Sequence, residues 1–140
     1  MTGAPGKDMA ERGRVTGIGG VFFKSRDPEA LSQWYARHLG VPYKAGEGAS
    51  FRWADDPQAE AGMTIWSAFP ADTKYFDPSP APFMINFRVS NLDALLAQLS
   101  SEGVRIDPKR EDYEYGKFAW IYDPDGNKIE LWQPLTPKKK

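Results

Sequence analysis

Hydrophobic residues recur along this chain with two alternating spacings, and each spacing predicts a different element. Residues 17–24 and 83–89 are rich in Phe, Val and Ile, a composition typical of β-strands. Each stretch is followed by apolar residues three or four positions apart, which is the spacing of one face of an α-helix. The first helical stripe consists of Leu31, Trp34, Tyr35 and Leu39, and the second of Leu92, Leu95, Leu96 and Leu99.

Short polar residues and glycines predict where the two helices begin and end. Asp27 is a suitable N-cap for the first helix, and Gly40 follows its last apolar residue. In the second half of the chain, Ser90 or Asn91 caps the helix and Gly103 ends it. Each half therefore begins with a strand and a capped helix.

The order of elements occurs twice because the chain contains an internal repeat. Both halves carry the pattern Phe-x-Trp-x-x-Asp-Pro, which begins at Phe51 and again at Phe118. Several matches in the same order indicate two copies of one structural unit. The other aligned pairs are residues 20–24 with 84–88 and residues 62–70 with 126–134.

Each copy is predicted to be a βαβββ module. Module one covers residues 15–70, module two covers residues 83–134, and a proline-containing linker at 71–82 joins them. The last two strands of module two, 117–122 and 128–133, flank the sequence Asp-Pro-Asp-Gly-Asn, which is a strong turn signal. Three shorter strands should therefore follow the helix in each module.

Composition limits the classes of function. The 140 residues, 41% of them hydrophobic, fit one domain, and a formal net charge of −1 gives no basic face for nucleic acid. The absence of cysteine excludes a disulfide scaffold, thiol catalysis and zinc–cysteine sites. No apolar run approaches the roughly 20 residues that span a bilayer. We expect a cytoplasmic protein that binds neither nucleic acid nor membranes.

The two ends of the chain are expected to lie outside the single domain at residues 15–134. Residues 1–14 are Gly-rich and polar, lack the apolar segment of a secretory signal, and are expected to be disordered. Residues 135–140 end in three lysines and are expected to form a solvated basic tail.

The two modules resemble the vicinal oxygen chelate superfamily, which includes glyoxalase I, extradiol dioxygenases, and bleomycin and fosfomycin resistance proteins. The motif Asp-Pro-Asp-Gly-Asn-Lys-Ile-Glu-Leu at residues 123–131 carries most of the resemblance, with support from Trp34-Tyr35 and Leu39-Gly40. The resemblance implies an α+β fold in which two βαβββ modules form a partly open, eight-stranded, barrel-like sheet around a cavity. It also implies a homodimer.

Enzymes of that superfamily chelate a divalent metal with four side chains, two from each module. The resemblance and the internal repeat place these positions at Gly20, Trp66, Met84 and Glu130. Of these, Glu130 alone offers an oxygen ligand, since the indole has no free lone pair and the thioether prefers soft ions. We therefore expect no cofactor. The alternative is a divalent metal ion at a non-standard site that includes other residues, such as Glu114.

Strand alternation predicts which side chains face the cavity. If Glu130 faces it, Lys128 and Trp132 do so too, and Trp120 lies across from Glu130 on the neighbouring strand. The aliphatic residues between them then face the helices. The predicted ligand-binding residues are Lys24, Trp66, Met84, Asn86, Arg88, Trp120 and Trp132.

This apolar, aromatic cavity with few polar groups is typical of a small-molecule site. We favour a metal-free binding protein whose ligand is an aromatic acid, with its carboxylate bound by Arg88. One alternative is an enzyme, either a lyase, an isomerase or a dioxygenase. It would use Glu130 as general base or as a metal ligand, with Lys24 or Arg88 stabilising an oxyanion. Another alternative is a structural or regulatory dimer in which the aromatic residues fill the barrel.

Two further features have a functional and a structural interpretation. His38 is the single histidine and lies in the last turn of the first helix, where the helix dipole favours it, so we expect a structural role. The acidic, aromatic loop Glu111–Gly116 is interpreted either as a lid over the cavity or as a solvated surface loop.

Overall fold

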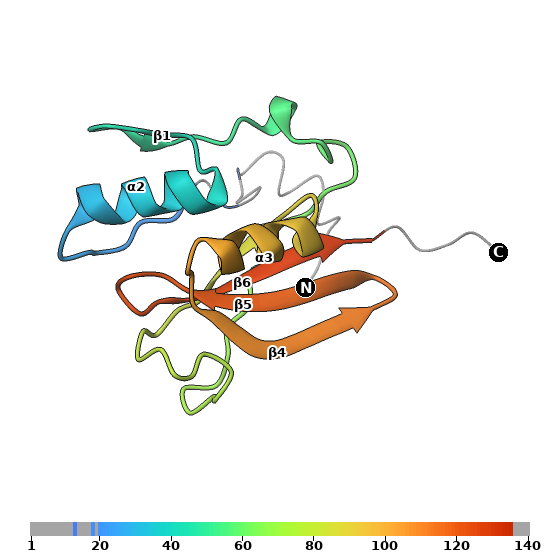
Figure 1. Ribbon diagram of the computed structural model, residues 1–140. Coiled ribbons are helices and arrows are strands. Elements are labelled where there is room, and N and C mark those ends of the chain that lie inside the picture. The colour runs from blue at the N-terminus through green and yellow to red at the C-terminus, as the bar shows by residue number, and fades with distance from the viewer. Residues whose placement is uncertain (1–12, 14–17, 19, 136–140) are drawn as a thin grey trace.

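Two α-helices and an open β-sheet organise the part of the chain that the computed structural model describes, residues 13, 18 and 20–135 (Figure 1). The sheet has the strand order β3-β6-β5-β4 and does not close into a barrel. The predicted α+β fold class is thereby confirmed. The four strands are β3 (Ile85–Arg88), β4 (Ile106–Tyr113), β5 (Gly116–Tyr122) and β6 (Lys128–Pro134).

A second sheet is a short hairpin of β1 (Tyr43–Lys44) and β2 (Gly48–Ala49), which pair antiparallel. Within the described residues, no helix is both long enough and apolar enough to cross a membrane. The predicted N-terminal disorder and the basic tail concern residues that lie almost entirely outside the described part of the chain.

Both long helices begin and end at predicted residues. The Asp27 side chain caps α2 (Pro28–Leu39) by accepting a hydrogen bond from the backbone N–H three residues on, at 3.1 Å. Gly40 ends this helix with a φ of 68°, a left-handed conformation that glycine adopts without strain. Asn91 caps α3 (Leu92–Ser101) in the same way at 3.1 Å, which decides between the two candidate caps.

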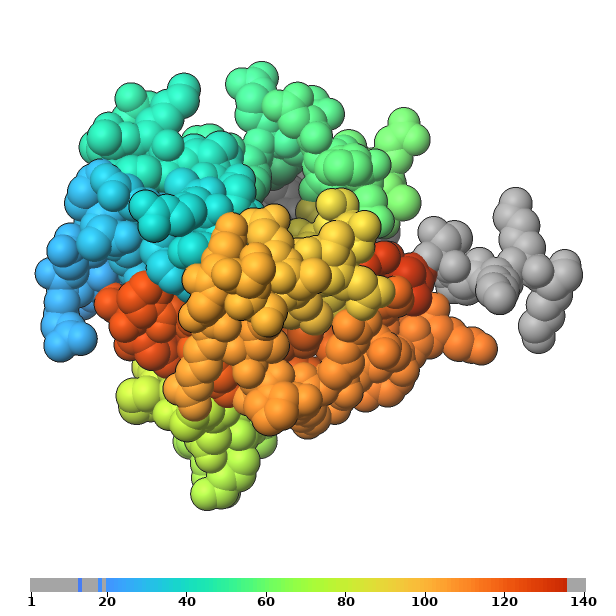
Figure 2. Space-filling view, in the orientation of Figure 1, coloured from blue at the N-terminus to red at the C-terminus, as the bar shows by residue number. Residues whose placement is uncertain are grey.

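The strand register matches the prediction from alternation. In the β5–β6 hairpin Trp120 lies opposite Glu130, and in the parallel β3–β6 pair Asn86 also lies opposite Glu130. The two helices lie side by side over one face of the sheet (Figure 2). Residues from both helices and from the helix-facing side of the sheet form the core, namely Leu31, Tyr35, Leu92, Leu99, Ala119, Ile121, Ile129 and Leu131.

His38 links the ends of the two helices. Its Nδ1 lies 2.7 Å from a carboxylate oxygen of Glu102, the residue that caps the end of α3, and its ring packs against Trp34. The histidine side chain is buried on the helix side of the sheet. This contact gives His38 the structural position expected from the sequence.

Module one differs from the prediction. Within the described residues neither 20–24 nor 62–70 forms a strand, so the described chain has six strands instead of eight. In module two a tight turn joins the last two strands. In module one the 3-10 helix η1 (Trp53–Asp55) lies where the repeat predicts the end of a strand, and the matching turn after it is longer. It continues through a bond from the Gly62 N–H to the Gln58 carbonyl. A turn of this length does not fix a strand register.

The acidic loop is a tight hairpin turn and not a hinged lid. Strand β4 extends to Tyr113 and β5 begins at Gly116, so only two residues separate them. The rings of Tyr113 and Tyr115 stack at 5.1 Å across the turn. A Cβ atom on Gly116 would lie 2.8 Å from the Trp132 Nε1 atom, so this close approach requires glycine.

Asp123 organises the turn between β5 and β6. Its carboxylate is 5% exposed and accepts hydrogen bonds from the Asp125 and Asn127 backbone N–H groups, both at 2.9 Å. It also accepts from the Asn127 side chain at 2.8 Å and from the Tyr35 hydroxyl at 2.7 Å. Burial raises the pKa of the Tyr35 phenol, and the bond to Asp123 adds to the increase. The phenol therefore stays protonated and keeps donating.

We predict that Asp123→Asn lowers the free energy of unfolding by about 2 kcal/mol or more. The amide has one acceptor oxygen instead of two, and its NH2 group would face donors in a buried site. Urea denaturation measures the change. Asp125→Asn is the control, because Asp125 is less buried and accepts a side-chain bond from Ser25. Equal effects of the two substitutions would contradict the role given to Asp123.

Candidate functional site

Glu130 lies in the middle of β6 on the face of the sheet that points away from the helices. The residue is only 9% exposed. Its Oε1 accepts a hydrogen bond from the Asn86 side chain at 2.7 Å, and its Oε2 accepts one from the Tyr75 hydroxyl. Trp120 faces it on β5 and is 1% exposed. The result is a buried carboxylate with two donors beside an aromatic wall.

Tyr75 belongs to residues 71–82, called the crossover segment here, which the sequence predicts to be a linker. Its ring stacks on Phe69 at a centroid distance of 5.5 Å and meets Trp120 edge-on at 6.1 Å. Burial raises the pKa of the Tyr75 phenol, and the hydrogen bond to Glu130 raises it further. The phenol is therefore a donor to Glu130 over the physiological pH range.

Two lysines place positive charge around the aromatic wall. The Lys128 Nζ lies 5.7 Å from the Trp120 ring centroid and donates a hydrogen bond to the Tyr75 carbonyl at 2.8 Å. The Lys109 Nζ lies 5.5 Å from the same ring. Both distances are within the range of a cation–π contact. The Trp120 Nε1 donor is buried and has no hydrogen-bond partner within the described residues.

The structure brings some predicted site residues together and leaves others apart. Asn86, Trp120 and Glu130 are neighbours, and Trp132 lies farther along β6 with its ring stacked on Phe118 at 6.2 Å. Met84 is half-buried just before β3. By contrast, two residues of module one are exposed and not part of this cluster, namely Lys24 and Trp66.

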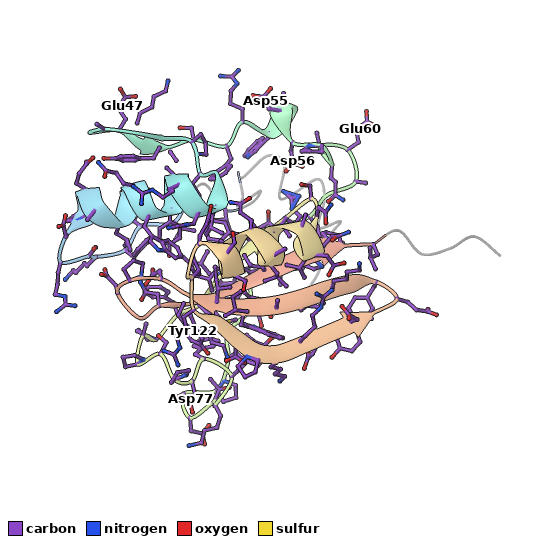
Figure 3. The ribbon with its side chains drawn as sticks, viewed as in Figure 1. Glu47, Asp55, Asp56, Glu60, Asp77 and Tyr122 are labelled. Carbon is purple, nitrogen blue, oxygen red and sulfur yellow. The ribbon has the colours of Figure 1, made fainter. Side chains whose placement is uncertain are left out.

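Arg88 forms an ion pair with Asp56, and both side chains are 28% exposed. Figure 3 shows Asp56 on the segment of module one at one end of the molecule, whereas Asp77 of the crossover segment lies at the other. A ligand carboxylate that binds Arg88 would have to compete with Asp56 or join it.

Sequence reasoning missed Tyr75 and Lys109 as parts of this site. Lys128 was placed on the correct face but was not included among the ligand-binding residues. A signal for the crossover segment was present, because Phe69, Tyr75 and Phe76 form an aromatic group beside a proline-rich connection. Aromatic residues in a linker need a surface to pack on, and here they pack on the open face of the sheet.

A family model described as the Glyoxalase/Bleomycin resistance protein/Dioxygenase superfamily matches residues 17–131. The chain belongs to this superfamily. Among curated proteins, none matches the chain. The match covers both modules, so it includes the Glu130 face and the first-module segments that form no strands.

Solved structures share the superfamily fold with this member. A glyoxylase/bleomycin resistance protein/dioxygenase domain from Frankia sp. EAN1pec is 17% identical with a TM-score of 0.56, covering 86% of this chain and 93% of that chain. Oxidase ChaP-H2 is 17% identical with a TM-score of 0.50, covering 81% of this chain and 90% of that chain. TnmS3, an antibiotic binding protein from Streptomyces sp. CB03234, is 23% identical with a TM-score of 0.49, covering 86% and 99%.

The donor groups of this superfamily member do not fit the metal that many relatives bind. At the four family positions Gly20 has no side chain, Met84 is a thioether, and the Trp66 indole is 80% exposed. The fourth, Glu130, already accepts two hydrogen bonds. Within the described residues no three His, Cys, Asp or Glu side chains are grouped to hold an ion. We therefore derive no chemistry through a metal.

We predict that the protein purified without a chelator carries no stoichiometric manganese, iron, nickel or zinc, because one carboxylate does not hold such an ion tightly. Elemental analysis of the dialysed protein measures this. Glu130→Ala and Glu114→Ala are the matched variants. A stoichiometric ion that is lost in either variant would contradict the prediction and would locate the site.

Proposed function

We propose that this superfamily member binds a small aromatic molecule on the Glu130 face without catalysing a metal-dependent reaction. The observation that carries the proposal is a buried carboxylate among aromatic rings that accepts one bond from strand β3 and one from the crossover segment. Apolar walls with a few polar groups in fixed positions are typical of ligand sites. The buried Trp120 N–H makes no well-formed hydrogen bond within the described residues, although it acts on the neighbouring Tyr75 phenol, and a ligand acceptor would satisfy it.

Binding is favoured over catalysis by the state of Glu130. Each of its two oxygens accepts a hydrogen bond from a neutral donor, one from Asn86 and one from Tyr75. A carboxylate that holds neutral donors on both oxygens is arranged to recognise donors.

We further propose that the ligand carries a carboxylate that reaches Arg88. Arg88 follows Asn86 by two residues on β3, roughly 6.6 Å along a strand. That spacing is comparable to the length of one substituted aromatic ring. A guanidinium binds a carboxylate through two parallel hydrogen bonds, and here it would exchange part of its ion pair with Asp56.

We predict that aromatic acids shift the amide NMR signals of β3, β5 and β6 and bind more tightly than their neutral amides. Arg88→Met should weaken binding of the acids about tenfold to a hundredfold, the value of one charge-assisted hydrogen bond. Trp120→Phe should also weaken binding, because the ring wall becomes smaller. Titration followed by NMR gives both the affinity and the location.

The internal repeat supplies a matched control for this experiment. Trp53 is the repeat partner of Trp120 and is 81% exposed, so Trp53→Phe should leave the affinity unchanged. Amides that bind as well as acids, or acids that bind Arg88→Met unchanged, would refute the anionic ligand. Shifts confined to module one would refute the Glu130 face itself.

We also propose that a second copy of the chain covers the exposed face of module one. Phe22, Trp53 and Trp66 are 95%, 81% and 80% exposed, whereas the repeat partner of Trp53 is 1% exposed. Strand β3 pairs with β6, and its other edge pairs with no strand of the described chain. Exposed apolar surface beside an open strand edge favours association between identical chains.

We predict that sedimentation equilibrium at micromolar concentration gives a dimer, and that Trp66→Ser together with Phe22→Ser shifts it towards monomer. Tyr115→Ser is the control, because Tyr115 is exposed on the β4–β5 turn of module two. A monomer at all micromolar concentrations, or equal weakening by the control, would refute the proposed dimer.

A further inference from the structure

Tyr75 occupies the place beside Glu130 that a bound molecule would need. Its hydroxyl donates to Glu130, and its ring contacts Phe69 and Trp120. Two hollows of the described surface are lined by residues of α2, and Glu130 lines neither. The Glu130 carboxylate and the Trp120 ring are 9% and 1% exposed, and the Tyr75 phenol is one of the groups that cover them.

The crossover segment carries Tyr75 and is ordered in part by its own hydrogen bonds. Its turns are closed by local hydrogen bonds, from the Asp77 N–H to the Lys74 carbonyl at 3.1 Å and from the Ser79 N–H to the Phe76 carbonyl at 3.0 Å. These bonds do not involve the sheet. Tyr75 fastens the segment to β6 through its hydroxyl and through its carbonyl, which accepts from Lys128.

We propose that Tyr75 is a built-in competitor for the ligand site, and that the ligand is an aromatic molecule whose hydroxyl replaces the Tyr75 phenol at Glu130. This inference rests on the proposed function, because it takes the Glu130 face as the binding site. It adds the group that the site recognises and the residue that controls access.

The need for a hydroxyl follows from the chemistry of a buried carboxylate. When Tyr75 leaves, Glu130 Oε2 loses its donor, and an unpaired buried charge is costly. An aromatic hydrocarbon would fill the space and leave that oxygen unpaired. A hydroxyl restores the donor, and its oxygen is also an acceptor. The Trp120 indole N–H already acts on the Tyr75 phenol, whose pKa it lowers, so a hydroxyl in the same place meets a donor as well as the carboxylate.

Chemical rescue tests the proposal directly, with 4-methylphenol as the probe because it is the tyrosine side chain without its backbone. Tyr75→Ala empties the site. The probe should bind Tyr75→Ala at least tenfold more tightly than the wild type, with NMR shifts on β5 and β6. Toluene lacks the hydroxyl and 4-methylanisole lacks its proton. Both should bind Tyr75→Ala at least tenfold more weakly than 4-methylphenol.

Two control variants separate competition from loosening of the segment. Phe76→Ala removes the neighbouring ring, which packs on Phe69 at 5.2 Å, and should leave the affinity for 4-methylphenol at the wild-type value. Tyr75→Phe keeps the ring and removes the donor, so its affinity should lie between those of the wild type and Tyr75→Ala. If Tyr75→Ala is partly unfolded, 4-methylphenol must raise its Tm more than that of the wild type.

Equal binding of 4-methylphenol to the wild type and Tyr75→Ala would overturn the competition. Equal binding of toluene and 4-methylphenol to Tyr75→Ala would overturn the recognition of a hydroxyl by Glu130. These failures are distinct from failure of the proposed function. Aromatic acids that bind the wild type at β5 and β6, without any gain in Tyr75→Ala, would leave the proposed function standing while this inference falls.

Discussion

The Glu130 face depends on Asp123, whose buried carboxylate connects the turn between β5 and β6 with helix α2. It closes the turn between β5 and β6 by accepting bonds from the backbone and side chain of that turn. It also accepts from Tyr35, so α2 of module one is fastened to the sheet of module two. The turn sets the register that places Trp120 opposite Glu130. A register slip of one residue would direct the Glu130 side chain into the apolar core, where it would have no hydrogen-bond donors.

Much of module two could be predicted from its sequence, because each local signal there agrees with the others. Strand alternation, the turn sequence and the caps all favour the same hairpin and helix, and the structure confirms them. The same reasoning failed for the strands of module one. There, Trp53 matches Trp120 in sequence, yet it is 81% exposed and its partner 1%. The two modules share a pattern of side chains. Module one lacks the tight turn that fixes the register of two neighbouring strands.

For the candidate site, alternation starting from the family positions Met84 and Glu130 was enough to bring Asn86, Trp120 and Glu130 to one face. Strand periodicity does not predict the hydrogen bond between Tyr75 and Glu130 or the ion pair between Arg88 and Asp56. Each of these contacts joins a strand to a segment without regular structure. The positions of such segments are set by what they pack against. The aromatic group next to the proline-rich linker was the available signal in the sequence. Interpreting it requires knowledge of the open sheet face that this group covers.

A carboxylate buried among aromatic rings constrains everything that can happen on that face. Its charge is tolerated because Asn86 and Tyr75 donate to it, while Lys128 lies near the same rings. Asn86 lies on the sheet, whereas Tyr75 is carried by a segment with its own internal bonds. The proposed exchange at Glu130 therefore concerns the Tyr75 side, where a replacing molecule must bring a donor with it. The Glu130 carboxylate makes the loss of Tyr75 costly, and for the same reason it selects molecules that carry a hydrogen-bond donor.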